Sequence, residues 1–361
     1  MVKEYVKLMK ANQYLTKMTK TWIIICLCLV SFFSCKPQDD MKKYEWRPTA
    51  CAPKYYPAEV IKGDFYMDDG TSIYIPTGHT LMHGWGDTGA IHLSGPDFKQ
   101  VPSSFSIKWV SYLEGKFYGG NFQLPKEKIT DYFEKGFVDR RGIQRTYTKT
   151  VIGLAPGGVL VVWLLGPGKV VEIERYQAKE IEVHIEDFKP YSATTLSNYL
   201  TSARNRIVND DIRGAIDVDN IPFGIWDIYR KKYEWNPTID FKNQSNVELT
   251  NVYFSYYNGE MFRTIGSNKK AMVKEQRAIP KESGITWTDG NGNEFGATIT
   301  FDDKEMLRLF HEVYLEDKNT SMEIIIQLDK YNSIITSYIK TETKTYPITK
   351  TVSEISVYTT E

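Results

Sequence analysis

The chain has little cysteine, no apolar run long enough for a membrane span and no charge imbalance. Its 361 residues include four cysteines, and its formal net charge is zero. A balanced charge lacks the basic footprint of nucleic-acid-binding domains, so we expect no nucleic-acid partner. The apolar run from Thr21 to Phe33 is shorter than the roughly 20 residues that a spanning helix needs.

The Thr21–Phe33 run instead fits the core of a secretion signal. Two lysines precede it, and Ser34 and Cys35 follow it directly. A small residue before a cysteine resembles a bacterial lipobox, in which the cysteine receives lipid, palmitate included, and becomes the mature N-terminus. We predict that residues 1–34 are the signal peptide, with Met18 as an alternative start. The competing interpretation is an uncleaved anchor with an incidental cysteine.

Cleavage before Cys35 would also determine which cysteines remain in the mature protein. Cys26 and Cys28 leave with the signal and Cys35 carries lipid, so Cys51 remains the free thiol and no intramolecular disulfide forms. The polar stretch Lys36–Asp40 resembles export signals on outer-surface lipoproteins of Bacteroidetes-like bacteria; the alternative is a plain linker. We therefore expect a cell-envelope protein that is lipid-anchored to the outer membrane, on its periplasmic or its cell-surface face.

Motifs of common catalytic and cofactor sites are missing. The mature chain has no Gly-x-Ser-x-Gly elbow, phosphate-binding loop or paired-cysteine metal site. His79 and His83 are four apart but lack the glutamate of a metalloprotease helix, and Asp289–Asn293 matches a turn better than a calcium loop. We predict no metal, no cofactor and no catalytic residue, and we lean against an enzyme.

An internal repeat organises what is present. Lys42–Thr49 (KKYEWRPT) returns almost unchanged as Lys231–Thr238 (KKYEWNPT). Seven identities in eight positions that include Trp, Tyr and Pro indicate a duplication. The sequence thus predicts an α+β fold of two tandem related units, each an antiparallel β-sheet with one packed helix.

Local patterns place the elements of both units. In the first, alternating residues predict strands, a Gly pair at 119–120 predicts a bulge, and apolar spacing over 126–137 predicts a helix. The continuous apolar run Val159–Leu165 predicts a central strand that is buried on both faces. The second unit repeats this order, with its helix over 302–314. The predicted organisation is signal peptide 1–34, lipidated Cys35 and tether 35–43, first unit 44–188, helical connector 189–225 and second unit 226–361.

Several short motifs in the first unit resemble a known family. They are Tyr44-Glu45-Trp46, Ala52–Pro57, Gly84-Trp85-Gly86, Trp109-Val110-Ser111, Phe122–Pro125 and Gly153–Gly158. Together they resemble an uncharacterised bacterial lipoprotein family, domain of unknown function 2931, over roughly residues 44–185. The resemblance implies a lipoprotein and assigns no catalytic residues.

Trp46, Trp85, Trp109 and Asp87 are the candidates for a ligand or partner surface. Exposed aromatic rings are a common platform for carbohydrate, although core packing is the competing interpretation of all three tryptophans. The leading hypothesis is a non-enzymatic binding or accessory lipoprotein that engages a periplasmic partner, including an immunity-like role against a toxin. The alternatives are a surface glycan-binding lipoprotein and a hydrolase with an unrecognised site.

Overall fold

The computed structural model describes residues 42–91, 95–265, 272–316 and 321–358. The predicted signal peptide, Cys35 and the tether up to residue 41 lie outside these residues. No helix in the described part of the chain is both long and apolar enough to cross a membrane. From Tyr44 onward the chain forms one compact unit.

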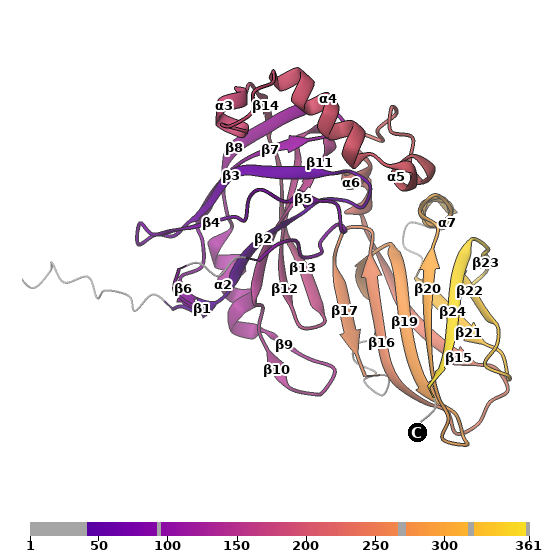
Figure 1. The fold of residues 1–361 in the computed structure, drawn as a ribbon. Helices are drawn as coiled ribbons and strands as arrows, with labels where there is room; N and C mark the ends of the chain where they lie inside the picture. Colours follow the sequence, from indigo (N-terminus) through magenta and orange to yellow (C-terminus); the bar gives the residue numbers. More distant parts are fainter. Residues whose placement is uncertain (1–41, 92–94, 266–271, 317–320, 359–361) are drawn as a thin grey trace, which may run out of the picture. The chain divides into compact units, whose positions relative to one another are not determined.

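The first half folds into two main sheets (Figure 1). One has the strand order β14-β8-β7-β3-β4, with β5 beside β3, and the other begins β2-β11-β12-β13. Two short pairs, β1–β6 and β9–β10, stand apart. The strands are β1 (Tyr44–Glu45), β2 (Arg47–Cys51), β3 (Ala58–Tyr66), β4 (Ser72–Tyr74), β5 (Thr80–Leu81), β6 (Phe98–Lys99), β7 (Ser104–Ser111), β8 (Lys116–Gln123), β9 (Phe137–Val138), β10 (Gln144–Arg145), β11 (Lys149–Ala155), β12 (Val159–Gly166), β13 (Lys169–Gln177) and β14 (Lys179–Ile181).

The second half contributes a five-stranded sheet and the rest of a nine-stranded one. The five-stranded sheet has the order β18-β15-β21-β22-β23, and the larger sheet continues as β17-β16-β19-β20-β24. These strands are β15 (Lys232–Phe241), β16 (Glu248–Tyr256), β17 (Met261–Thr264), β18 (Glu275–Ala278), β19 (Pro280–Thr288), β20 (Glu294–Phe301), β21 (Met322–Leu328), β22 (Ile335–Lys340), β23 (Thr345–Ile348) and β24 (Thr351–Tyr358).

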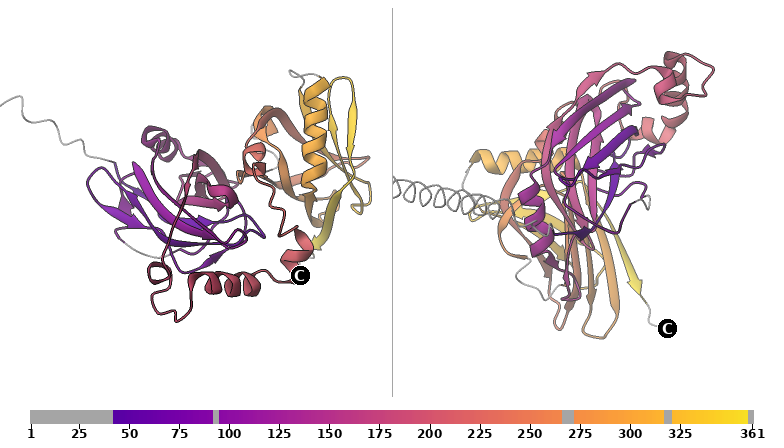
Figure 2. Two further views of the ribbon diagram at one scale, coloured as in Figure 1. Left: turned by 90° about the horizontal axis from the view of Figure 1, so that it is seen from above. Right: turned by 90° about the vertical axis from the view of Figure 1, so that its left-hand side faces the viewer.

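Helices occupy both segments predicted as amphipathic helices and the predicted connector, and two short helices that the sequence did not predict flank the connector. The helices are α2 (Lys126–Lys135), α3 (Ile185–Phe188), α4 (Leu196–Ile207), α5 (Asp210–Ala215), α6 (Ile225–Tyr229) and α7 (Asp303–Glu316), with one 3-10 turn at Pro156–Gly158. Helix α2 buries Ile129 and Phe133, and α7 buries its apolar stripe, Phe310 included. Figure 2 shows α7, the gold helix of the left view, along strands of its own half. The two predicted amphipathic helices are confirmed.

Strand β12 is the centre of the first half's share of the large sheet. It lies between β11 and β13, and every residue from Val159 to Leu164 is buried. A strand with both faces covered needs apolar side chains in both directions, which explains its continuous run. The prediction of a central strand buried on both faces is confirmed.

The prediction that each unit is a purely antiparallel sheet is wrong. Strand β2 pairs with β11 in parallel, from Arg47↔Lys149 to Cys51↔Gly153, and β15 pairs with β21 in parallel as well. Parallel partners need a long crossover connection, and the strands and helix between them supply it in both halves. Turn signals reveal only partners that are close in sequence, so the sequence did not reveal these pairs.

The Gly119–Gly120 pair does not form a bulge. The register between β7 and β8 runs without a shift through Lys108↔Gly119 and Ile107↔Gly120. A Cβ on Gly120 would lie 2.6 Å from the ring of Phe122, and one on Gly119 would lie 2.9 Å from the Ile181 side chain. Close side-chain packing, rather than an inserted residue, therefore explains the two glycines.

The halves have separate cores but share the nine-stranded sheet. Strand β13 pairs with β17 through Lys169↔Phe262 and Val170↔Met261. Beside this pairing, the Trp163 indole donates a hydrogen bond of 3.1 Å to the Asn258 carbonyl. One short strand pairing and its flanking contacts thus join two hydrophobic cores into one unit.

Candidate functional site

Two of the predicted surface residues are core residues. Trp46 and Trp109 are both 0% exposed. The Trp46 indole donates a hydrogen bond of 3.0 Å to the Gln100 carbonyl, whereas the Trp109 Nε1 has no partner among the described residues. Neither ring has a face open to a ligand, in line with the core interpretation that the sequence left open.

Trp85 and Asp87 lie in the loop where the two halves meet. The Trp85 ring packs edge-on against Trp163 with 4.8 Å between centroids, and it is half-buried. A Cβ on Gly86 would lie 2.2 Å from the Gly259 carbonyl oxygen, so the two backbones touch there. Asp87 is exposed, and its carboxylate accepts the Thr88 amide at 2.7 Å. The glycines around Trp85 thus allow close approach to the second half.

The free thiol of Cys51 is buried behind the same loop. Burial raises the pKa of Cys51 to about 12, although the Gly86 amide that hydrogen-bonds to it acts in the opposite direction. A thiol with such a pKa remains protonated at neutral pH and is a poor nucleophile. Cys51 is therefore a packing residue of the first half.

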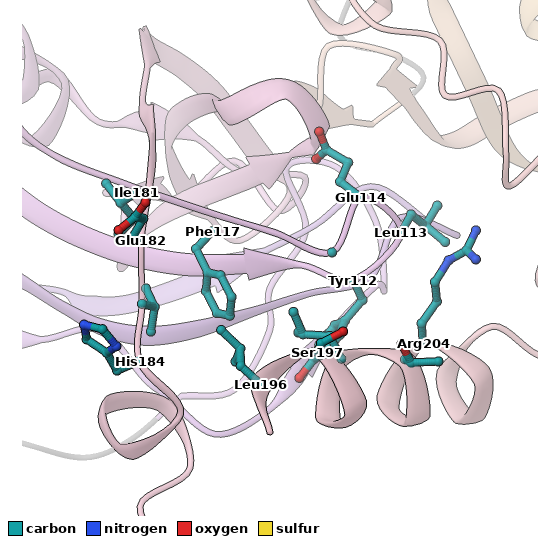
Figure 3. A pocket seen from close by; sticks show the side chains of 14 residues that line it. Tyr112, Leu113, Glu114, Phe117, Ile181, Glu182, His184, Leu196, Ser197 and Arg204 are labelled. Atoms are coloured by element: carbon teal, nitrogen blue, oxygen red, sulfur yellow. The ribbon is translucent and has the colours of Figure 1, made fainter. Parts of the chain in front are cut away.

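A groove of about 740 Å³ lies under helix α4. We call it the α4 groove; its walls are α4, the turn between β7 and β8, the start of β8, and the end of β14 with the segment that follows it. Figure 3 shows Phe117 pointing toward Leu196, with His184 and Arg204 toward opposite ends. Leu200 adds to the apolar centre. The groove is apolar in its middle and polar at its ends.

Charged groups around the α4 groove already form hydrogen bonds and ion pairs within the fold. Both oxygens of the Glu114 carboxylate lie 3.1 Å from the Gly157 amide, and one of them also accepts the Tyr118 hydroxyl at 2.7 Å. Arg204 pairs with Asp219 at 2.9 Å, while its Nε is buried without a partner among the described residues. The Glu114 carboxylate is thus occupied with fixing the 3-10 turn after β11.

The lining of the α4 groove includes a serine, a histidine and a glutamate, but these do not form a catalytic triad. In the described structure no hydrogen bond joins Ser197 to His184 or His184 to Glu182. Figure 3 places Leu196 and Phe117 between the histidine and the serine. A nucleophile needs its base within hydrogen-bond reach, and this geometry does not bring the serine and the histidine together.

The match to known families covers the α4 groove. A family model described as "Protein of unknown function (DUF2931)" matches residues 34–224, more than half of the chain. The chain belongs to the DUF2931 family. No curated protein and no solved structure matches it. The DUF2931 match includes the first half and helices α3 to α5, and it ends before the second Tyr-Glu-Trp stretch.

Sequence reasoning did not find the residues that line the α4 groove. Phe117 and Ile181 have the pattern of ordinary strand residues, and Leu196 and Leu200 that of an amphipathic helix. The apolar spacing of α4 indicates that one face packs against something, but it does not say against which strands. In this DUF2931 protein the hollow arises because the connector folds back onto β7 and β8.

Proposed function

We propose that this DUF2931 protein is a lipid-anchored, non-enzymatic binding protein of the bacterial cell envelope, and that a protein partner docks in the α4 groove. The observation that carries the proposal is the groove itself. It combines an apolar centre with polar ends, and its residues lack the mutual hydrogen bonds of a catalytic site. Grooves of this composition suit an extended or helical segment of a partner.

The proposed lipid anchor rests on the sequence before the first strand. Ser34-Cys35 follows an apolar run of signal length, and β1 begins at Tyr44, so residues 36–43 would be the tether. Labelled-palmitate incorporation tests it directly. Wild type should take up label and Cys35→Ala should not, whereas equal labelling of both would contradict a lipid at Cys35.

Docking in the α4 groove is tested by replacing an apolar side chain of the groove with a charged one. Leu200→Asp places a carboxylate in the groove, while Ser202→Asp on the same helix adds the same charge to an exposed position outside it. Affinity for the envelope partner recovered by crosslinking should fall at least about tenfold for the first variant, because a buried unpaired charge is costly, and should stay unchanged for the second. Equal binding by both would refute docking in the groove.

We also propose that the two halves are tandem copies. The order β2-β11-β12-β13 parallels β15-β21-β22-β23, and each set begins with a parallel pair and continues antiparallel. The other sheet of each half is a meander that leads into one helix, α2 or α7. The same connections in the same order support descent from one duplicated unit.

The contacts of the two repeated tryptophans also support the duplication. Trp46 and Trp235 are both 0% exposed, and each donates its indole N–H to a backbone carbonyl, at 3.0 and 3.2 Å. A buried cation lies over each indole: the Lys99 Nζ is 5.1 Å and the Arg277 guanidinium 5.8 Å from the ring centroid. An equivalent indole, acceptor and cation recur in both halves.

The tyrosines before these tryptophans are equivalent too. Tyr44 stacks on Phe133 of α2 with 4.9 Å between centroids, and Tyr233 packs on Phe310 of α7 at 5.1 Å. The Tyr-Glu-Trp stretch thus fixes the helix to the sheets in each half. This shared role is in line with the near-identity of the stretch in the two halves.

A further inference from the structure

A second hollow, of about 510 Å³, lies where β13 meets β17. We call it the junction cleft; helix α2, the start of β13, β17 and β18 line it, so both halves contribute. Its volume is within the range of small-molecule sites. It is separate from the α4 groove, so an occupant here would be a function beyond the proposed docking.

Each carboxylate that lines the junction cleft has a cationic partner. Glu260 pairs with Lys232 at 2.6 Å and Glu275 with Arg277 at 2.6 Å. At the rim the one remaining carboxylate, of Asp131, pairs with a lysine of α2. Behind the cleft, the Glu172 carboxylate pairs with Arg230 at 2.6 Å. These anions are therefore neutralised locally.

Lys169 is the cation left over. It lies at the start of β13 and lines the cleft, yet its ammonium makes no ion pair or hydrogen bond among the described residues. Burial lowers the pKa of Lys169, against the opposing effect of the Glu275 and Glu260 charges. A partly buried, unpaired ammonium is costly, and an anion beside it would remove that cost.

Tyr147 adds an unused donor to the same cleft. It is 1% exposed, it lines the cleft, and its hydroxyl has no hydrogen-bond partner in the described part of the chain. Burial raises the pKa of Tyr147, so the hydroxyl keeps its proton and remains a donor. Buried tyrosine hydroxyls normally have a partner. Lys169 and Tyr147 thus present two unsatisfied donor groups to one hollow.

We propose that the junction cleft binds an organic oxyanion, a small molecule with a carboxylate or phosphate group that Lys169 and Tyr147 hold. A bare inorganic ion would leave most of the 510 Å³ unfilled. Tyr132, Phe137 and Phe262 line the remaining space, and rings of this kind pack against an apolar or ring-shaped body. Charge selects one end of the ligand and the aromatic wall contacts the other.

Calorimetric titration of the mature protein with phenyl phosphate, benzoate and neutral benzyl alcohol tests this site. At least one of the two anions should bind, and benzyl alcohol should bind at least about tenfold more weakly because it lacks the charge. Comparison of the two anions separates a phosphate from a carboxylate site. Absence of binding by both at millimolar concentration, or equal binding of benzyl alcohol, would overturn the proposal.

Two variants and one control locate the binding. Lys169→Met removes the charge at similar length and should weaken anion binding by about tenfold or more, and Tyr147→Phe by roughly threefold to tenfold. Lys108→Met removes an exposed lysine on β7 and should leave affinity unchanged. Because Tyr147→Phe deletes a single oxygen, it keeps the test decisive even if Lys169→Met fails to fold. Wild-type affinity in Tyr147→Phe, or in folded Lys169→Met, would refute the assignment.

Discussion

Replacing either repeated tryptophan by phenylalanine should destabilise the protein to a similar extent. In Trp46→Phe, the Gln100 carbonyl loses its indole donor, and the cation–π contact of Lys99 weakens because phenylalanine is a poorer partner than tryptophan. In Trp235→Phe, the Ala278 carbonyl loses its donor and the cation–π contact of Arg277 weakens in the same way.

Three contributions set the magnitude. A buried carbonyl without its donor costs about 1–3 kcal/mol, and a weakened cation–π contact costs at most about 0.5 kcal/mol. The smaller ring also leaves a cavity, at about 1–2 kcal/mol, since Trp-to-Ala changes in cores cost about 3–5. These effects overlap in one place, so we expect about 2–5 kcal/mol for each variant.

Trp85→Phe is the matched control. The Trp85 ring is half-buried and its Nε1 has no hydrogen-bond partner among the described residues, so the substitution removes area but no hydrogen bond. We expect about 1 kcal/mol. Urea unfolding followed by far-UV circular dichroism measures all three variants without relying on indole fluorescence. The reasoning would be refuted if Trp46→Phe cost less than about 0.5 kcal/mol, or no more than Trp85→Phe.

Three further predictions concern the loop at the junction, acid stability and the free thiol. Gly86→Ala should cost about 2–4 kcal/mol in urea unfolding, because its Cβ would lie 2.2 Å from the Gly259 oxygen at a φ of +77°; a cost under about 1 kcal/mol would contradict the close contact. Burial acts to raise the pKa of Glu305, but hydrogen bonds from the Thr349 hydroxyl and neighbouring amides outweigh it and lower that pKa below its ordinary 4.5. The stability from Glu305 is thus present above about pH 4.5 and lost as the pH falls through the lowered pKa, so acid titrations of unfolding should decline less steeply in Glu305→Gln; an unchanged slope would be evidence against it. Cys51 should resist iodoacetamide in the native protein and react once urea unfolds it, as read by mass spectrometry of its peptide; fast native alkylation would contradict its burial.

Much of the local structure could be predicted from the sequence. Elements whose side chains repeat at a fixed period, such as α2 or the alternating strand β3, carry their signal within a few residues. The same holds for β12, because burial on both faces leaves no polar position. Hairpins such as β21–β22 follow from a turn between two apolar runs.

Long-range pairing could not be predicted in the same way. The β13–β17 contact has only two register pairs, Lys169↔Phe262 and Val170↔Met261. Neither segment carries a sequence pattern that identifies the other as its pairing partner. The two parallel pairs were missed for the same reason. Local periodicity tells which face of an element is buried, while the partner depends on chain segments far away.

The candidate sites show this limit most clearly. Trp46 and Trp109 are conspicuous in the sequence as aromatic residues, yet they are fully buried. Lys169 is one of many lysines and gives no signal by itself. It stands out only because the structure places it in a cleft where the lining carboxylates are already paired. Unsatisfied donors are a property of the assembled fold.

The central claim is that an anchored protein binds a partner in the α4 groove. The most direct measurement is photo-crosslinking in intact cells with a photoreactive residue at Thr201, which lines the groove, or at Ser202, which does not. The account predicts one specific crosslinked protein for position 201, none for 202, and loss of the product in Cys35→Ala. The same products from both positions, or none from either, would contradict it.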